Sequence, residues 1–378
     1  MRILYVLNDT LHHAGTESVI LNYYNHIDRE RYQIDFLLNA PKSELEENDI
    51  CRYLIKKGSK VFCITPRRVD SKKNKQEYLE ILKSEKYDIV HTHVDAIGSY
   101  FLSLAQTAGV KVRIAHSHNT RHQLANKGIK NRIHYAYLEK CRKDIRREAT
   151  HYMACSKEAG EWLFGRENID NKKVYILNNA IDTGKFKFNQ AIRDEVRKEL
   201  GIKDDEILIG HIGRFKPQKN HAFLIDVFKE ISETDNTSKL LLVGDGPLKE
   251  EIEEKVKAYN IADRVIFYGE TKDTSRLLNA MDIFLFPSVH EGLSVVMIEA
   301  QCNGLKCIMS DTDEVSKDTV ITDNVECLTL DDPKEWANKT LNAETSRKDE
   351  TKTLADKGYD ITKEAKKLED FYSGILSE

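Results

Sequence analysis

The chain has 378 residues, of which 40% are hydrophobic and 32% are charged, and its formal net charge is −4. Single cores stop growing at about 250–300 residues, so this length predicts two domains. The small negative charge excludes a general binder of nucleic acid or another polyanion and limits any basic patch to a local surface.

Short apolar, β-branched runs alternate with longer stretches of helical spacing along the chain. Strands are predicted at 2–7, 33–37, 60–64, 88–91, 111–116, 151–154 and 174–177, and a second series at 207–212, 239–243, 264–268, 282–286, 306–309 and 319–321. Helices are predicted between them, for example at 18–24, 77–84, 222–231, 249–259 and 295–303. Such repetition predicts an α/β protein with two Rossmann-like, doubly wound domains built on parallel sheets.

The boundary between the two series is expected near 179–186, where the last strand of the first series runs into a turn-rich stretch. The predicted domains are 1–180 and 181–361, and an amphipathic helix at 362–378 is expected to cross back to the first domain. Ligands of open α/β sheets bind beyond the carboxyl ends of the strands, so the residues that follow strands are the candidates for function.

The sequence favours the cytoplasm. Its seven cysteines show neither a C-x-x-C pair nor metal-finger spacing, which favours thiols over a disulfide framework. The apolar run at 2–7 is too short for the core of a signal peptide, and no apolar stretch reaches the ~18 residues of a membrane span.

Histidines follow three strands of the first series. His12 and His13 lie in the loop after the first strand, just before Gly15 is expected to open a helix; an ordinary surface loop is the alternative. Two His-x-His pairs, His91/His93 and His116/His118, end two further strands. Alternate residues of a strand share a face, so each pair points one way. We expect no metal here, because no carboxylate or cysteine partner stands at matching spacing.

The segment 126–147 combines several Lys and Arg residues with Ile133, Tyr135, Tyr137 and Leu138. One interpretation is a solvated helix face. The other is a basic amphipathic helix that docks on an anionic membrane surface and brings the protein to a lipid-linked substrate.

In the second series, Gly213, Arg214 and Lys219 follow one strand. Two cations beside a tight glycine turn suit a diphosphate, although a basic surface loop is the alternative. Gly244 and Gly246 end the next strand in a turn that resembles a nucleotide-binding loop, which is a weak signal alone. Tyr268 and its neighbouring glycine end another strand whose backbone is suited to border a base.

A further strand ends at Pro287, and the loop after it carries Glu291 and Gly292. Ser294 is placed to cap the following helix, whose amide groups and partial positive charge suit a diphosphate. Glu299 lies more than a turn inside that helix. Either glutamate can accept hydrogen bonds from sugar or ribose hydroxyls, and the alternative is a pair of solvated charges. The pair Asp311 and Asp313 is interpreted as a turn without a metal ion.

The order of these motifs resembles the retaining glycosyltransferases of the GT-B fold, specifically family 4, whose two Rossmann-like domains face a central cleft. The resemblance covers essentially the whole chain. The motifs that carry it are the Glu-x7-Glu signature at Glu291 and Glu299, the basic pair at Arg214 and Lys219, the Gly-x-Gly-Pro turn at 244–247 and an Asn-Gly-Ile-Asp-like linker at 179–186. Two positions depart from many members, because Ser294 and Lys306 stand where those have proline; this puts the donor's identity in doubt, not the activity.

The resemblance implies a role for each candidate residue. Glu299 is expected to hold the ribose hydroxyls, and the cations the diphosphate. The implied catalytic residues are Glu291, His118, Arg214 and Lys219. The implied donor-binding residues are Gly15, Gly213, Arg214, Lys219, Gly244, Gly246, Tyr268, Glu291, Gly292, Leu293, Ser294 and Glu299. The acceptor-side candidates are His13, His93 and His116.

The implied activity is transfer of a hexose or N-acetylhexosamine from a nucleotide-sugar, with uridine favoured, to a saccharide or lipid-linked acceptor in cell-surface polysaccharide biosynthesis. No cofactor, metal ion or nucleic acid is expected, and the localisation is cytoplasmic or peripheral on the inner membrane face. The alternatives are a sugar-nucleotide epimerase of similar fold and an inactive nucleotide-binding partner subunit.

Overall fold

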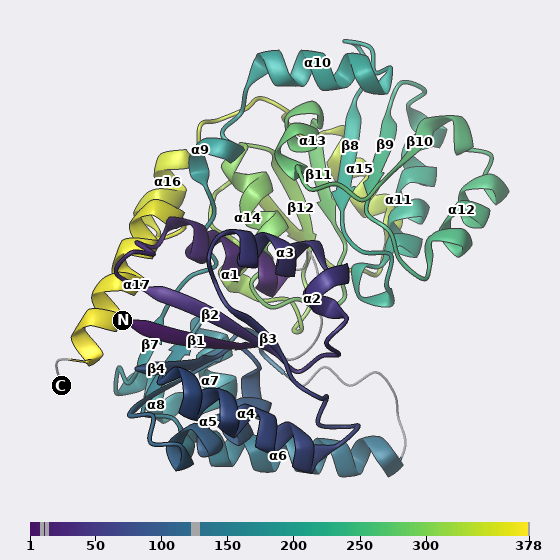
Figure 1. Cartoon of the computed structure of the whole chain (residues 1–378). Helices are drawn as coiled ribbons and strands as arrows, with labels where there is room; N and C mark the ends of the chain where they lie inside the picture. Colours follow the sequence, from purple (N-terminus) through teal and green to yellow (C-terminus); the bar gives the residue numbers. More distant parts are fainter. Residues whose placement is uncertain (8–10, 12–14, 122–128, 377–378) are drawn as a thin grey trace. The chain divides into compact units, whose positions relative to one another are not determined.

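The computed structural model describes residues 1–378 except 8–10, 12–14, 122–128 and 377–378 (Figure 1). The chain folds into two compact units. Unit 1 contains Met1–Ala180 together with Ile361–Glu378, and unit 2 contains Ile181–Asp360. The chain therefore leaves unit 1 once and returns to it with its last helix.

Unit 1 is built on a parallel sheet. Among the described residues it has seven strands in the order β3-β2-β1-β4-β5-β6-β7. Their bounds are β1 Arg2–Leu7, β2 Gln33–Leu38, β3 Val61–Cys63, β4 Ile89–Thr92, β5 Val112–Ser117, β6 His151–Ala154 and β7 Val174–Ile176. The central strands β1 and β4 are almost completely buried, as expected of a parallel sheet covered on both faces.

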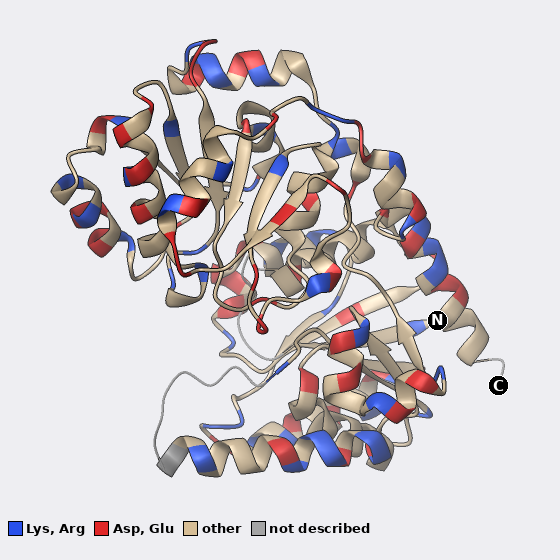
Figure 2. Cartoon of the chain, turned by 180° about the vertical axis from the view of Figure 1, so that it is seen from behind, with Lys and Arg blue, Asp and Glu red and all other residues tan. Residues whose placement is uncertain are grey.

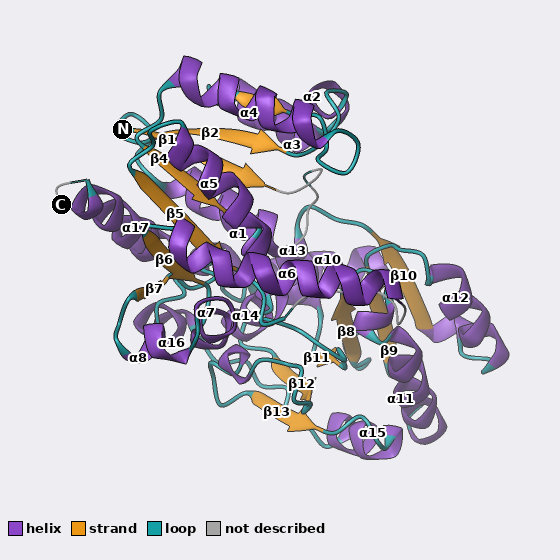
Figure 3. Cartoon of the chain, turned by 90° about the horizontal axis from the view of Figure 1, so that it is seen from below, coloured by secondary structure: helices purple, strands orange, loops and turns teal. Residues whose placement is uncertain are grey.

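Helices cover both faces of this sheet, with α4, α5 and α6 on one side and α1 with α17 on the other (Figures 1 and 3). The bounds are α1 Gly15–His26, α2 Glu44–Glu47, α3 Asp49–Lys56, α4 Ser71–Glu85, α5 Gly98–Thr107, α6 Ile129–Glu148, α7 Lys157–Phe164, α8 Arg166–Asp170 and α17 Ile361–Ile375, with a 3-10 turn at Asp95–Ile97. The returning helix α17 is held by specific polar contacts. The backbone N–H of Asp28 donates to the Glu369 carboxylate over 2.8 Å, and the Tyr32 hydroxyl donates to the Glu369 carbonyl over 2.9 Å.

Unit 2 repeats the architecture. Its parallel sheet has six strands among the described residues, in the order β10-β9-β8-β11-β12-β13. The bounds are β8 Leu208–Ile212, β9 Lys239–Val243, β10 Val265–Gly269, β11 Ile283–Phe286, β12 Lys306–Ser310 and β13 Val325–Leu328. The two parallel sheets confirm the predicted fold class of two Rossmann-like domains.

The helices of unit 2 are α9 Thr183–Phe186, α10 Gln190–Leu200, α11 His221–Thr234, α12 Lys249–Ala258, α13 Thr274–Ala280, α14 Val295–Cys302, α15 Pro333–Leu341 and α16 Thr351–Asp356, with 3-10 turns at Pro217–Lys219, Ala262–Arg264 and Lys317–Thr319. Helix α10 shows how local sequence sets an element's ends. The Asn189 side chain caps its first amide groups, and Gly201 ends it in the left-handed conformation that glycine adopts without strain.

One predicted strand was wrong. Residues 319–321 do not join the sheet, because the Ile321 amide donates to Oε1 of Gln301 on α14 over 2.9 Å. The edge strand is β13, a few residues later, where Glu326 pairs with Lys306 and Lys339. An edge strand is half exposed and can therefore carry charged residues. For this reason the apolar pattern of β13 is weaker than that of residues 319–321 before it.

Candidate functional site

The loops after β8 and β11 meet in unit 2, because these strands are neighbours in the sheet. Nζ of Lys219 lies 2.7 Å from Oε1 of Glu291, and both side chains are largely buried. The side-chain amide of Gln218 donates to the same Oε1 over 3.1 Å and to the His290 carbonyl over 3.0 Å. The structure thus brings together two of the predicted site residues and adds Gln218, which the sequence analysis did not single out.

The position of Lys219 depends on its neighbours. Its ammonium lies over the ring of Phe286, the last residue of β11, 4.7 Å from the centroid. A Cβ added at Gly213 would lie 3.2 Å from the Lys219 stem and 2.9 Å from the His211 ring. Glycine at this strand end therefore leaves room for the lysine side chain.

Arg214 does not join this pair. Its side chain is exposed, and within the described part of the chain no ion pair engages its guanidinium. It keeps its donors available to an anionic ligand, whereas Lys219 is already paired with a carboxylate.

Gly244 and Gly246 have a packing role. Gly244 has a φ of +135°, and a Cβ there would overlap the Gly213 carbonyl. A Cβ at Gly246 would lie 2.6 Å from the Phe215 carbonyl oxygen. Backbone hydrogen bonds then join the ends of β8, β9 and β10, for example from Gly244 to Gly269 over 2.8 Å. Tyr268 on β10 is 41% exposed.

Helix α14 begins directly after the Glu291 loop. Ser294 occupies its N-cap position, but the predicted capping bond is absent: among the described residues, the Ser294 side chain accepts no hydrogen bond from the helix. The backbone of Glu291 is fixed instead by pairing with the 314–316 segment. The first-turn amides that follow Gly292 and Leu293 therefore keep the anion-binding character of a helix N-terminus.

Glu299 belongs to a different set of contacts. The Thr274 hydroxyl donates to its Oε2 over 3.1 Å, and Lys185 lies near enough to act on its charge. Burial raises the pKa of the Glu299 carboxyl to about 7. Within the described residues no contact joins Glu299 to Glu291. Thr274 and Lys185 were not predicted from the sequence, because an isolated Thr or Lys carries no recognisable signal.

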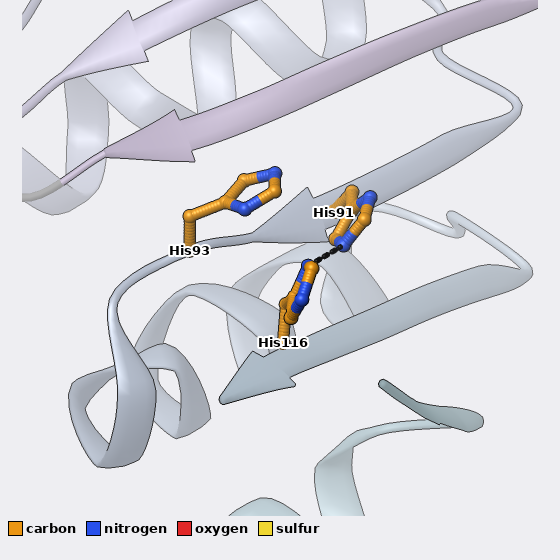
Figure 4. A group of neighbouring side chains, drawn as sticks. All are labelled: His91, His93 and His116. Carbon is orange, nitrogen blue, oxygen red and sulfur yellow. Dashed lines mark hydrogen bonds between the residues drawn. The ribbon is translucent and has the colours of Figure 1, made fainter. Parts of the chain in front are cut away.

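In unit 1, the two His-x-His pairs form one buried cluster at the carboxyl ends of β4 and β5. Figure 4 shows three of its four members, His91, His93 and His116. Nε2 of His91 lies 3.2 Å from Nδ1 of His116, and Nδ1 of His93 lies 3.0 Å from Nε2 of His118. Burial and the neighbouring histidines hold the pKa values of His91, His93 and His116 well below the usual range, and burial lowers that of His118 to about 3. These rings are therefore neutral at physiological pH.

A partly buried carboxylate lies beside this cluster. The backbone N–H of His118 donates to Oδ1 of Asp95 over 2.8 Å, and the Asn119 side chain donates to Oδ2 over 2.6 Å. Burial raises the pKa of the Asp95 carboxyl to about 6, and those hydrogen bonds oppose the rise. The other candidates at this end, His12 and His13, lie outside the described residues, and Gly15 begins α1.

The predicted basic segment corresponds largely to α6, and its positions 126–128 lie outside the described residues. Leu138 and Ile145 are buried, whereas Ile133 and Tyr135 are 67% and 50% exposed. Acidic residues interrupt the basic ones in the second half of the helix only, from Glu139 onward (Figure 2). Among the described residues, none of the helices combines the length and apolar character that a membrane span needs.

In unit 2, the cation of Lys219, the side-chain amide of Gln218 and the N-terminus of α14 follow adjacent strands. This combination suits a phosphate-bearing ligand. Its carboxylates suit hydroxyl groups. Asp311, which the sequence placed in a turn, pairs with Lys317 after β12.

Comparison with known proteins identifies the relatives of this chain. The family model described as Glycosyl transferases group 1 matches residues 192–365, and that described as Glycosyltransferase Family 4 matches 13–185. EpsF of Bacillus subtilis (strain 168), which carries the name of a glycosyltransferase, is 32% identical over 98% of this chain and 96% of its own. The UDP-Gal:alpha-D-GlcNAc-diphosphoundecaprenol alpha-1,3-galactosyltransferase of Escherichia coli is 26% identical over 79% of this chain and 76% of its own.

A solved structure has the same fold. Anabaena Alr3699/HepE, crystallised in complex with UDP-glucose, superimposes with a TM-score of 0.76 over 99% of this chain and 100% of its own, at 18% sequence identity.

Proposed function

Because the chain belongs to the family 4 glycosyltransferases of the GT-B fold, we propose that it transfers a hexose or N-acetylhexosamine from a UDP-sugar, with retention of configuration, to a saccharide or lipid-linked acceptor. The product contributes to a cell-surface polysaccharide. The observation that carries the proposal is the Lys219–Glu291 pair, joined by Gln218, beside the start of α14.

Unit 2 binds the donor in this proposal. The diphosphate sits at the N-terminus of α14, where Ser294 leaves the first amide groups to the ligand. Lys219 and the exposed Arg214 neutralise its charge, so no metal ion is assigned to this step. Glu291 holds the Lys219 ammonium from the other side and accepts hydrogen bonds from the donor sugar. Glu299 accepts hydrogen bonds from the ribose hydroxyls.

The transfer step is a substitution on one face of the sugar. The bond between the anomeric carbon and the diphosphate oxygen loosens, and the charge that develops on the leaving oxygen is stabilised by Lys219 and Arg214. The departing phosphate takes the proton of the acceptor hydroxyl as the new bond forms. Glu291 is poorly suited to a double displacement, because its Oε1 is already bound by Lys219 and Gln218.

The UDP donor is supported by two comparisons: the name of the Escherichia coli relative specifies UDP-Gal, and the Anabaena structure contains UDP-glucose. The lipid-linked acceptor is supported by the same relative, whose name specifies a diphosphoundecaprenol substrate. Docking of the enzyme on an anionic membrane surface is supported by the exposed Ile133 and Tyr135 on the acid-free first half of α6.

The test is release of nucleoside diphosphate from a panel of UDP-, GDP- and ADP-sugars, with and without saccharide and lipid-linked acceptors. We expect release from one UDP-sugar, enhanced by an acceptor and lost in Glu291→Ala. Conversion of the donor without acceptor and without release would indicate an epimerase. Binding of UDP without release from any donor–acceptor pair would indicate an inactive partner subunit.

A further inference from the structure

The proposed transferase function leaves the histidine cluster of unit 1 largely unexplained. In the β4–β5 register Thr92 lies opposite Ala115, so the next residues, His93 and His116, also face each other. The side chains of His91, His93 and His116 point toward one another from the two strands (Figure 4). All three are at least nine-tenths buried.

We propose that His91, His93 and His116 form a binding site for one divalent transition-metal ion of the zinc class. Each of the three offers a ring nitrogen, and these nitrogens lie within 4.8 Å of one another. Three imidazoles with an open fourth position are an established ligand set for zinc. An all-nitrogen set favours zinc, cobalt, nickel or copper over the oxygen-binding magnesium and calcium ions.

Two of the ligand nitrogens already have the spacing that coordination to one ion requires. With Zn–N bonds of about 2.0–2.1 Å, two nitrogens on a tetrahedral ion lie about 3.3 Å apart. Nε2 of His91 and Nδ1 of His116 are 3.2 Å apart, and their rings lie within 15° of a common orientation. The His93 ring is stacked on that of His91, with centroids 4.2 Å apart, so it joins after turning about its Cβ–Cγ bond.

Nitrogens of the cluster also lack partners. Within the described part of the chain, Nε2 of His93 and Nε2 of His116 are buried without a hydrogen bond. An unsatisfied buried polar atom costs about 1–3 kcal/mol, so two of them in one cluster need an explanation. A rotated His93 that binds the ion through Nε2 relieves the first of these costs, because metal coordination replaces the missing contact. His116 binds the ion through Nδ1, so its Nε2 is not relieved by the ion.

The surroundings resemble those of known metal sites. Ligating histidines use their second nitrogen to bind an outer partner that fixes the ring. Nδ1 of His91 lies 2.7 Å from the Tyr372 hydroxyl, which in turn lies 2.8 Å from that of Tyr5. A proton on Nδ1 leaves Nε2 with its lone pair for the ion. The partly buried Asp95 carboxylate, bound to the His118 backbone, supplies negative charge nearby.

The ion has a structural role in this proposal. It ties the ends of β4 and β5 together and, through Tyr372, secures α17 on unit 1. The transfer step does not pass through it, because the diphosphate is neutralised by residues of unit 2. Metal binding can therefore fail while transfer persists, and the reverse also holds.

The test uses the full-length chain after removal of metal with a chelator and dialysis. Titration with Co²⁺ should give the intense visible bands of a tetrahedral nitrogen site, saturating at one equivalent, and Zn²⁺ should displace them. Zn²⁺ should also raise Tm, since it binds the folded state. His116→Gln and His93→Gln should abolish both effects, whereas the control His26→Gln, exposed on α1, should keep them.

A milder variant guards against unfolding of the ligand variants. Tyr372→Phe removes only the outer partner and should weaken Zn²⁺ binding about 10–100-fold. Zn²⁺ binding by the wild-type chain tests the proposal even if the ligand variants unfold. Less than one equivalent of Zn²⁺ retained in equilibrium dialysis, or binding that survives equally in His116→Gln, would overturn the proposal.

Discussion

The hydroxyl of Tyr372 lies 2.7 Å from Nδ1 of His91, although 281 positions separate the two residues in the chain. The same hydroxyl lies 2.8 Å from that of Tyr5 on β1. One atom of α17 therefore joins two strands of the sheet and attaches the C-terminal helix to the interior of unit 1.

Tyr372→Phe should destabilise unit 1. The change leaves the ring in place but removes a partner from two buried polar groups, which costs about 1–3 kcal/mol. Denaturant unfolding of the two proteins measures the difference. Tyr268→Phe is the control, because that tyrosine is 41% exposed. An equal effect of the two changes would contradict the role given to Tyr372.

The contact shows where sequence reasoning ends. The His-x-His pairs were visible as strand ends, and they form one group because their strands are neighbours in the sheet. Their anchoring by Tyr372 was not predictable, because it depends on where a helix from the far end of the chain docks.

Most strands were predictable for a physical reason. β11 is a continuous apolar run, and β8 is interrupted only by Gly210 and His211, because both faces of a parallel sheet are covered. Lys219 and Glu291 followed from the same logic, since each stands in the loop after such a strand. Gln218 and Thr274 were missed, because a single amide or hydroxyl acquires its role only from the carboxylate that the fold places beside it.

Gly244→Ala should destabilise unit 2 by about 2–5 kcal/mol, since a Cβ there overlaps a carbonyl and also strains a positive φ. Gly201→Ala is the matched control. Its φ is +66° but its surroundings are open, so it should cost only about 1–2 kcal/mol. Thermal unfolding compares the two. A Gly244→Ala protein that is as stable as the control variant but binds UDP poorly would assign the glycine to the ligand instead.

Ile133→Glu should weaken binding to vesicles of phosphatidylglycerol at least about tenfold. The change removes an exposed apolar side chain from α6 and adds a negative charge beside Arg132, where the anionic surface is proposed to bind. Ile55→Glu is the control, because Ile55 is 47% exposed on α3, a different helix of unit 1. Sedimentation with vesicles measures the difference. Equal retention of both variants would argue against docking through α6.

The carboxyl of Glu299 should make the donor KM depend on pH. Its pKa of about 7 means that it is largely protonated at pH 6 and ionised at pH 8. The ionised form accepts hydrogen bonds from both ribose hydroxyls, so KM for the donor should fall over this range. Glu299→Gln should flatten the profile, whereas Glu250→Gln, exposed on α12, should not.

The same group affects stability without donor. In the unfolded chain the carboxyl ionises near pH 4.5, but in the folded protein it ionises near 7. The folded state therefore gains from the protonated form at low pH and loses this gain as pH rises through 7. The Tm of Glu299→Gln minus the Tm of wild type should therefore be larger at pH 8 than at pH 6. A constant difference in Tm across this range would contradict the raised pKa.

Lys219→Met should lower kcat/KM about 10²–10³-fold, because the variant loses the cation that stabilises charge on the leaving diphosphate. Lys216→Met, exposed on the same loop, should stay near wild type. The Lys219 change also leaves Glu291 without its ion-pair partner, so a loss of fold must be separated from a loss of chemistry. Glu291→Gln and the double variant complete a cycle that does so. If the pair serves only the fold, the double variant should recover stability and activity together. If Lys219 acts on the diphosphate, the double variant should recover stability while its kcat/KM stays at or below that of Lys219→Met, because Glu291 also contacts the donor sugar in the proposed function.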